Sequence, residues 1–203
     1  MAEQQPRRTP LADATDLLAE ATRAAGGAIT MAEVPFRTQI NLRLDPESPI
    51  ADAVGKELGL ALPTEAGTSA RSGDVTVLWL GPDEWLVVAP PGAAEQLTGQ
   101  LRSAIGTEHA SVVDVSAQRT TLLLGGSRVR DVLAHGCSLD LHPSRFPAGA
   151  CAQTMLAHAP VILLALPAGE FWVLVRASFA AYLADWLFDA TLEDRHEDRL
   201  EQR

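Results

Sequence analysis

"LGPDEWLVVAPPGAAEQLTGQL" (residues 80–101) aligns without a gap on "LPAGEFWVLVRASFAAYLADWL" (residues 166–187), so the chain contains an internal repeat. Each stretch reads as the second strand of a β-hairpin followed by an amphipathic helix. Equivalent apolar positions coincide, and Leu97 of the first helix falls on Leu183 of the second. The repeat therefore predicts that two parts of the chain have the same local structure.

The segments upstream of the repeated stretches also correspond to each other. "RTQINLRL" (37–44) precedes one predicted helix, and "RTTLLLGG" (119–126) precedes another. We infer two halves of strand, helix, hairpin and helix, about 36–105 and 112–190. A period of this length is too long for a solenoid. We expect the halves to share one sheet system in a single duplicated α+β domain with pseudo-twofold symmetry.

Further helices are predicted from apolar spacing and from the residues that begin and end helices. One lies before Gly26, one runs from Pro49 to Gly59, and one is capped by Ser127. The predicted organisation is an N-terminal arm and helix (1–28), the duplicated domain (29–190) and a charged C-terminal tail (191–203).

Composition narrows the classes of partner. The chain has 203 residues, 47% of them hydrophobic, which is enough to bury a sizeable core. A net charge of −10 disfavours nucleic acid and anionic membranes, because both would repel it. No apolar run approaches the ~20 residues of a membrane span. Two cysteines without CxxC spacing indicate free thiols. We expect a cytoplasmic protein whose partners are proteins or small molecules.

A single carboxylate, Asp114, interrupts the β-rich run "VVDVSAQRTTLLLGG" (112–126). Strand alternation puts Asp114 on the same face as Val112 and Ser116. Asp114 could be a general base or ligand anchor, or a structural residue satisfied by Arg119 and nearby amides. The structural interpretation is favoured, because no nucleophile, second acid or histidine accompanies Asp114 at catalytic spacing.

For the other candidate residues, a structural role is also favoured over a chemical one. Three histidines and both cysteines lie close together in sequence: His135, Cys137, His142, Cys151 and His158. Their spacing fits no familiar metal site, and Cys151 reads as a small buried hydrophobe. Four tryptophans on predicted hairpin strands and the last helix read as core or interface anchors: Trp79, Trp85, Trp172 and Trp186. The GxGxxG motif of dinucleotide-binding folds is absent.

No residue is predicted to be catalytic, cofactor-binding or metal-ligating. The structural or interface candidates are Asp114, Ser116, Arg119, Cys151, Trp85 and Trp172.

Several segments, taken in order, resemble one family. They are "GPDEWLVVAP", "VVDVSAQRTTLLLGG", "VRDVLAHGCSLDLHP", "FPAGACAQT" and "FWVLVRASFAAYLADWL". Together, over about 34–190, they resemble the gamma subunit of heterotetrameric sarcosine oxidase. The resemblance implies the fold of the folate-binding domain of the glycine-cleavage aminomethyltransferase, where a D-x-S element opens a strand as Asp114 and Ser116 would here. The acid that positions folate in that enzyme has no counterpart in "AHAPVILLALP" (157–167).

The resemblance implies an accessory subunit without its own cofactor. The complex would demethylate sarcosine to glycine and release formaldehyde or methylene-tetrahydrofolate together with hydrogen peroxide. FAD, FMN, NAD, zinc and tetrahydrofolate would be held by other subunits. The chain would pack chiefly against the alpha subunit, with beta and delta subunits in the same complex.

Two alternatives remain open. One is a stand-alone folate-binding, aminomethyltransferase-like protein. The other is a folate-dependent iron–sulfur maintenance protein, whose Lys-Gly-Cys-Tyr motif is only faintly resembled by Gly149, Cys151 and Gln153.

Overall fold

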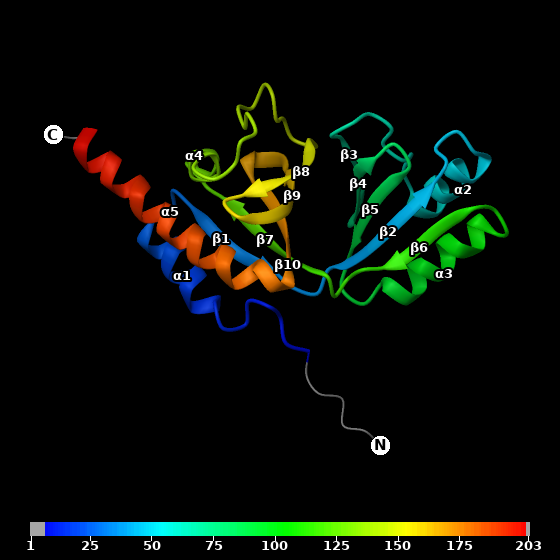
Figure 1. Cartoon of the computed structure of the whole chain (residues 1–203), viewed down its shortest axis with the longest axis horizontal. Coiled ribbons are helices and arrows are strands. Elements are labelled where there is room, and N and C mark those ends of the chain that lie inside the picture. Colours follow the sequence, from blue (N-terminus) through cyan, green and yellow to red (C-terminus); the bar gives the residue numbers. More distant parts are fainter. Residues whose placement is uncertain (1–6, 202–203) are drawn as a thin grey trace, which may run out of the picture.

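Two five-stranded antiparallel sheets lie between two layers of helices in the computed structural model of the chain, which describes residues 7–201 and the side chains of 7–192 (Figure 1). Sheet A consists, in spatial order, of β1 (Thr30–Val34), β7 (Arg119–Gly125), β10 (Phe171–Arg176), β9 (Ala159–Ala165) and β8 (Cys151–Leu156). Sheet B consists of β3 (Ser69–Ser72), β4 (Val75–Gly81), β5 (Glu84–Ala89), β2 (Thr38–Leu44) and β6 (Ala110–Asp114).

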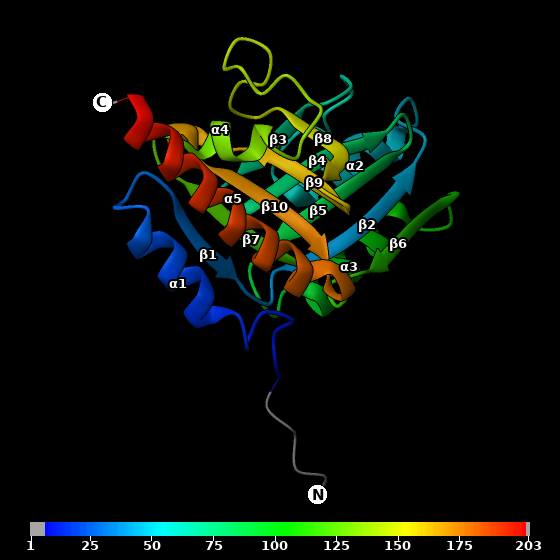
Figure 2. The ribbon, with the colours of Figure 1, turned by 60° about the vertical axis from the view of Figure 1, so that its left-hand side comes forward.

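Helices cover the outer face of each sheet. The helices on sheet A are α1 (Thr15–Ala24), α4 (Val129–Ala134) and α5 (Ala180–Glu201), and those on sheet B are α2 (Pro49–Leu58) and α3 (Ala94–Ile105). Figure 2 shows α1 and α5 side by side over sheet A. Short 3₁₀ turns occupy Pro167–Gly169 and Ala177–Phe179.

Three hydrophobic clusters hold these layers together, one under each helical layer and one between the sheets. Strand β5 shows how the sequence builds them. Trp85 and Val87 point into the cluster shared with α2 and α3, while Leu86 and Val88 point toward sheet A. A strand covered on both faces needs a continuous apolar run, which is what "EWLVVA" supplies.

The duplicated α+β architecture predicted from the repeat is confirmed. In sheet B, Ile40 pairs with Val87, and in sheet A, Leu122 pairs with Val173. Under the internal alignment, Ile40 is equivalent to Leu122 and Val87 is equivalent to Val173, so the two strand pairs have the same register. The two halves also meet at equivalent positions, because Thr68 and Ala150 form an isolated β-bridge.

The expectation of one shared sheet system is wrong, because the halves form two separate sheets that exchange a strand. Strand β6 follows the first half but pairs with β2 in sheet B, and β1 from the N-terminal region completes sheet A beside β7. Residues 112–126 are thus two strands in different sheets. The chain turns between them, where the Gln118 N–H donates to the Val115 carbonyl at 2.9 Å.

Most predicted elements are present with small shifts. Helix α2 begins at Pro49 and ends at Gly59, which has the left-handed φ of 70° expected of a helix-terminating glycine. The residue before α4 is Arg128, one position after the predicted cap Ser127. The described helix α5 continues through most of the charged tail, whose last two residues lie outside the described part, as do residues 1–6 of the N-terminal arm. Within the described residues, no helix is long and apolar enough to span a membrane.

Candidate functional site at the junction of the two sheets

Two links carry the chain from one sheet to the other, and they are tied together around Gln39. Residues 35–37 lead into β2, and residues 115–118 lead into β7. The Gln39 carbonyl accepts a hydrogen bond from the Val115 N–H at 2.8 Å, and the Gln39 N–H donates to Ser116 Oγ at 2.9 Å. Gln39 Nε2 also donates to the Arg119 carbonyl at 3.1 Å. Gln39, 1% exposed, therefore fixes both links in place.

Asp114 lies at the end of the edge strand β6, and its side chain is exposed. Its Oδ1 accepts hydrogen bonds from the Ser116 N–H at 2.9 Å and from the Ser116 hydroxyl. This arrangement is an Asx turn, in which a carboxylate replaces a backbone acceptor and stabilises a change of chain direction. Asp114 and Ser116 therefore have structural contacts at the link between the sheets.

The expected pairing of Asp114 with Arg119 is wrong. Within the described residues, Asp114 takes part in no ion pair, and Arg119 Nη1 donates instead to Gln118 Oε1 at 2.6 Å. The physical reason is the position of β6 at the edge of sheet B. The end of an edge strand is exposed to solvent, so alternation along the strand does not imply that Asp114 is buried. Asp114 is thus not a buried charge that needs a counter-ion.

Arg119 lies beside a second arginine. Arg119 on β7 pairs with Arg176 on β10, so the two side chains leave sheet A on the same face. Burial lowers the pKa of Arg119 from its ordinary value, Arg176 lowers it further, and Glu84 in sheet B acts in the opposite direction. Both arginines line a pocket of about 450 Å³ that also includes Gln153 and Met155. Such a pair of guanidinium groups can bind an anion.

The two candidate tryptophans are structural. Trp85 is fully buried, and its Nε1 donates to the Pro63 carbonyl at 2.7 Å. Trp172 is 5% exposed in the cluster between the sheets. The guanidinium carbon of Arg37 lies 4.8 Å from the centre of the Trp172 ring. Burial lowers the pKa of Arg37 from its ordinary value, and nearby Asp74 acts in the opposite direction.

Cys151 lies between the sheets with a protonated thiol at neutral pH. Its Sγ is 3.1 Å from the Thr68 carbonyl and 3.6 Å from the Trp79 carbonyl. Burial raises the pKa of the Cys151 thiol to about 11, although hydrogen bonding with the Trp79 backbone acts in the opposite direction. A buried, protonated thiol is a weak nucleophile, because the thiolate is the reactive form.

The five histidines and cysteines that are close in sequence are not brought together in the fold. His142 Nδ1 is 2.8 Å from Ser144 Oγ in the loop after α4, and the His158 ring packs near Tyr182. Over the part of the chain that the structure describes, no three His, Cys, Asp or Glu residues form a group suited to a metal ion. The residues present do not fit a zinc site.

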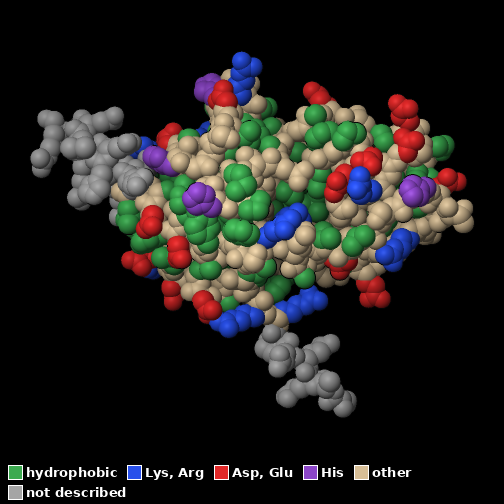
Figure 3. Space-filling view, in the orientation of Figure 1, with side chains coloured by type: hydrophobic (Ala, Val, Ile, Leu, Met, Phe, Trp, Pro, Cys, Tyr) green, Lys and Arg blue, Asp and Glu red, His purple; other side chains and the backbone are tan. Residues whose placement is uncertain are grey.

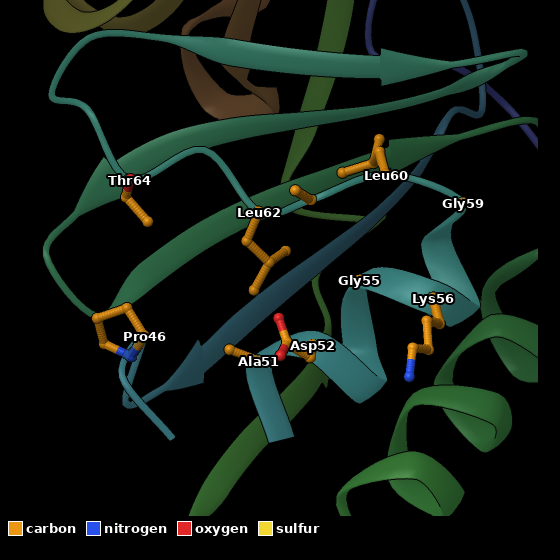
Figure 4. Close-up of a pocket in the computed structure, with 10 residues that line it drawn as sticks. Pro46, Ala51, Asp52, Gly55, Lys56, Gly59, Leu60, Leu62 and Thr64 are labelled. Carbon is orange, nitrogen blue, oxygen red and sulfur yellow. The ribbon is translucent and has the colours of Figure 1, made fainter. Parts of the chain in front are cut away.

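Another pocket, of about 430 Å³, lies between α2 and residues 60–64 (Figure 4). Asp52 and Lys56 line it from successive turns of α2, but Figure 4 shows their side chains pointing in different directions. Helix and loop pack tightly behind it, because a Cβ at Gly55 would lie 2.8 Å from the Leu60 carbonyl oxygen. The pocket gathers no set of groups that could act together chemically.

The model of the sarcosine oxidase gamma subunit family matches residues 43–193 of the chain. The chain is also 38% identical over 188 residues to sarcosine oxidase subunit gamma from Corynebacterium sp. (strain P-1), a match that covers 92% of this chain and 91% of that protein.

The chain belongs to the sarcosine oxidase gamma subunit family.

Solved structures agree with this membership, and the resemblance inferred from the sequence is confirmed. A chain of heterotetrameric sarcosine oxidase from Corynebacterium sp. U-96, solved with pyrrole 2-carboxylate, superimposes with a TM-score of 0.85 and 36% identity, covering 93% of this chain and 96% of that one. The glycine cleavage system aminomethyltransferase T from Bartonella henselae superimposes with a TM-score of 0.62 and 15% identity, covering 84% of this chain and 48% of that one. The second match shows the fold alone.

The sequence of this gamma-subunit family member did not identify three residues that matter at the junction: Arg37, Gln39 and Arg176. A signal existed for Arg176. The internal alignment places it opposite Pro90, so one half carries a charge where the other carries none. No comparable signal marked Gln39, whose importance depends on the chain links that meet beside it.

Proposed function

We propose that the chain is the gamma subunit of a heterotetrameric sarcosine oxidase and that it serves the complex as a structural subunit. The observation that carries this proposal is the match over 93% of this chain and 96% of a chain of solved heterotetrameric sarcosine oxidase, at a TM-score of 0.85. A match over nearly the whole of both chains, at 36% identity, supports a role in the same kind of assembly.

The proposed complex demethylates sarcosine to glycine and delivers the one-carbon unit as formaldehyde or methylene-tetrahydrofolate, with hydrogen peroxide as the other product. We place FAD, FMN, NAD, zinc and tetrahydrofolate on the other subunits. The burial of Cys151, whose Sγ contacts two backbone carbonyls, supports this division for zinc. The alpha subunit is the proposed chief partner, with beta and delta in the same complex. The cytoplasmic location stays a prediction.

Co-expression tests the proposal. A tagged copy of this chain is expressed with the three other subunits of a sarcosine oxidase, and the purified material is assayed for subunit content and for sarcosine oxidation. We expect all four subunits and activity to elute together. Recovery of the tagged chain alone would overturn the proposal. The cofactor-free role is tested by releasing this chain from the complex and measuring its flavin and metal, which we expect to be below stoichiometric amounts.

The stand-alone folate enzyme is the weaker candidate, since its support is the shared fold at 15% identity. It predicts tetrahydrofolate binding by the purified chain without any other subunit, which equilibrium dialysis can measure. The iron–sulfur maintenance alternative depends on a reactive cysteine at position 151. The burial of Cys151 and its contacts with two backbone carbonyls argue against that role.

A further inference from the structure

Two arginines stand together at one end of sheet A, on the face directed toward sheet B. Arg119 and Arg176 occupy paired positions on β7 and β10. Gln153 on β8 borders the same pocket, and its Nε2 donates to the Leu80 carbonyl of sheet B at 3.1 Å. No acidic residue lines this pocket of about 450 Å³. We call it the Arg119–Arg176 pocket.

The positive charges of this pocket are not balanced by the chain itself. Within the described residues, neither arginine forms an ion pair, and the guanidinium of Arg176 makes no hydrogen bond. Glu84 acts on the charge of Arg119, but its Oε1 already accepts a hydrogen bond from Asn41 Nδ2 at 2.7 Å. Two adjacent cations are therefore held together at a cost in Coulomb repulsion.

The internal repeat shows that the fold does not require this pair. Under the alignment that matches Val87 to Val173, Arg176 is equivalent to Pro90, and Arg119 is equivalent to Arg37. The first half therefore has an arginine, Arg37, at the position of Arg119, but a proline at the position of Arg176. A second arginine, Arg71 on β3, also acts on Arg37, so what sheet A has alone is an arginine at the position of Arg176.

The acid that serves the first half is also missing from the second. Asp74, in the turn between β3 and β4, opposes the lowering of the Arg37 pKa, so it lies close enough to act on that charge. The position equivalent to Asp74 in sheet A is Pro160, which lines the Arg119–Arg176 pocket. Each half thus places a second arginine near the first, Arg71 near Arg37 and Arg176 beside Arg119, but the pocket of sheet A has lost the carboxylate that acts on Arg37.

The rim of the pocket has the composition of a protein interface. Met155 is 46% exposed and lies beside Pro160. Methionine and arginine are enriched where proteins meet. Figure 3 shows basic side chains near the middle of one face of the molecule, with acidic side chains scattered over the same face. A cationic spot on a chain of net charge −10 would direct an acidic group to one place.

We propose that the Arg119–Arg176 pocket is a docking site for an Asp or Glu side chain of another subunit of the complex. The two guanidinium groups can each donate to one carboxylate, which replaces the acid that sheet A lacks. The inference rests on the proposed function, since it assigns a contact within the same assembly.

Charge removal tests the site in the co-expressed complex. Arg176→Gln should raise the dissociation constant of this chain from the assembled complex by about 10-fold or more, because the partner's carboxylate is left unpaired. Arg176→Glu should weaken assembly further. Arg145→Gln removes the same charge from an exposed loop and should leave the constant unchanged. If the unaltered chain did not assemble, the proposed function would fail; if it assembled and the Arg176 variants bound equally well, this inference alone would fail.

Zero-length cross-linking tests the contact directly. Lys56 is the only lysine in the sequence, so a carbodiimide can join few sites of this chain to carboxylates. Arg176→Lys retains the charge and adds a reactive amine in the pocket. We expect a cross-linked peptide that joins the substituted position to an Asp or Glu of another subunit. A cross-link confined to this chain's Glu84, to a second copy of this chain, or no cross-link at that position would overturn the proposal.

Discussion

Arg37 reaches from the link before sheet B to sheet A, where its guanidinium carbon lies 4.8 Å from the centre of the Trp172 ring. The Arg37 Nε is buried without a hydrogen-bond partner, so the face of the ring and the nearby Asp74 compensate the charge at this point. A cation held over an aromatic face in a partly desolvated place contributes about 0.5 to 2 kcal/mol. The contact joins the two sheets independently of the backbone links.

We predict that Arg37 and Trp172 are energetically coupled. In a double-mutant cycle of Arg37→Gln and Trp172→Leu, the free energies of unfolding should show a coupling of about 0.5 to 2 kcal/mol. Urea unfolding of the purified full chain measures it. Arg43→Gln, which removes an exposed arginine bonded to Asp83, should show no coupling to Trp172→Leu. Additive losses for the Arg37 pair would mean that the ring does not stabilise the charge.

Asp114 should tolerate loss of its charge but not loss of its acceptor. Asp114→Asn keeps an oxygen for the hydrogen bonds from Ser116, so its free energy of unfolding should stay within about 0.5 kcal/mol of the unaltered chain. Asp114→Ala removes both bonds and should cost about 1 kcal/mol.

Two further measurements separate this role from others. Arg119→Gln combined with Asp114→Asn should give additive losses, because the two side chains do not pair. Complexes that carry Asp114→Asn should oxidise sarcosine at the normal rate per flavin. Normal assembly with strongly reduced turnover would instead assign a catalytic role to Asp114.

Cys151 should make stability fall at alkaline pH. Its pKa is raised from 9.0 to about 11, so the folded state binds the thiol proton more tightly than the unfolded state does. Its stabilising contribution is present below about pH 9 and is lost as the pH rises toward 11. The unaltered chain should therefore lose up to roughly 2 kcal/mol relative to Cys151→Ala between about pH 7.5 and about pH 10.5. Urea unfolding at the two values measures the gap.

Cys151→Ser checks the cause of that pH dependence. Serine does not titrate in this range, yet its hydroxyl can donate to the carbonyls of Thr68 and Trp79. The serine variant should match the alanine variant in its pH dependence, whatever its absolute stability. A serine variant that still lost stability like the unaltered chain would show that another group titrates.

Gly126→Ala should destabilise the chain more than an ordinary glycine replacement. Gly126 has a φ of +102°, and a Cβ there would lie 2.2 Å from the Ala28 carbonyl oxygen, which also accepts the Arg128 N–H at 3.1 Å. The substitution forces the start of β1 away from α4, at a cost of about 2 kcal/mol or more.

Gly73→Ala provides the matched control for this prediction. Gly73 also has a positive φ, +55°, but a Cβ there would meet nothing within 4 Å. Its replacement should cost only the backbone strain of about 1 to 2 kcal/mol. Melting curves of both variants compare the two effects, and equal losses would show that the contact with Ala28 carries no energy.

The repeat was readable in the sequence because both halves keep the same register. Leu78 pairs with Leu86, and Leu164 pairs with Trp172. The internal alignment matches Leu78 to Leu164 and Leu86 to Trp172, so it predicts that the two hairpins have the same register. Buried strands of this kind leave continuous apolar runs that survive in both copies. Their order along the chain was therefore predictable.

The exchange of strands between the sheets was not predictable from the same patterns. Strand β1 has one buried side chain, Met31, so its alternation is too weak to mark a strand. Strand β6 shows a pattern, but alternation reports which residues are buried and not which sheet the strand joins. The same limit explains Asp114, whose exposure follows from β6 lying at an edge. The pairing of Arg119 with Arg176 likewise depends on the register of two strands far apart in sequence.

The place of β1 in sheet A has a consequence for synthesis on the ribosome. Thr30 pairs with Gly125, so the strand leaves the exit tunnel long before its partner does. At about 5 to 20 residues per second, β1 stays unpaired for roughly 5 to 20 s. During that interval sheet B can form from residues 38–114 alone, since all five of its strands lie within them. The first complete sheet of the nascent chain is thus sheet B, and any ribosome-associated chaperone would meet β1 as an unpaired strand beside an already folded half.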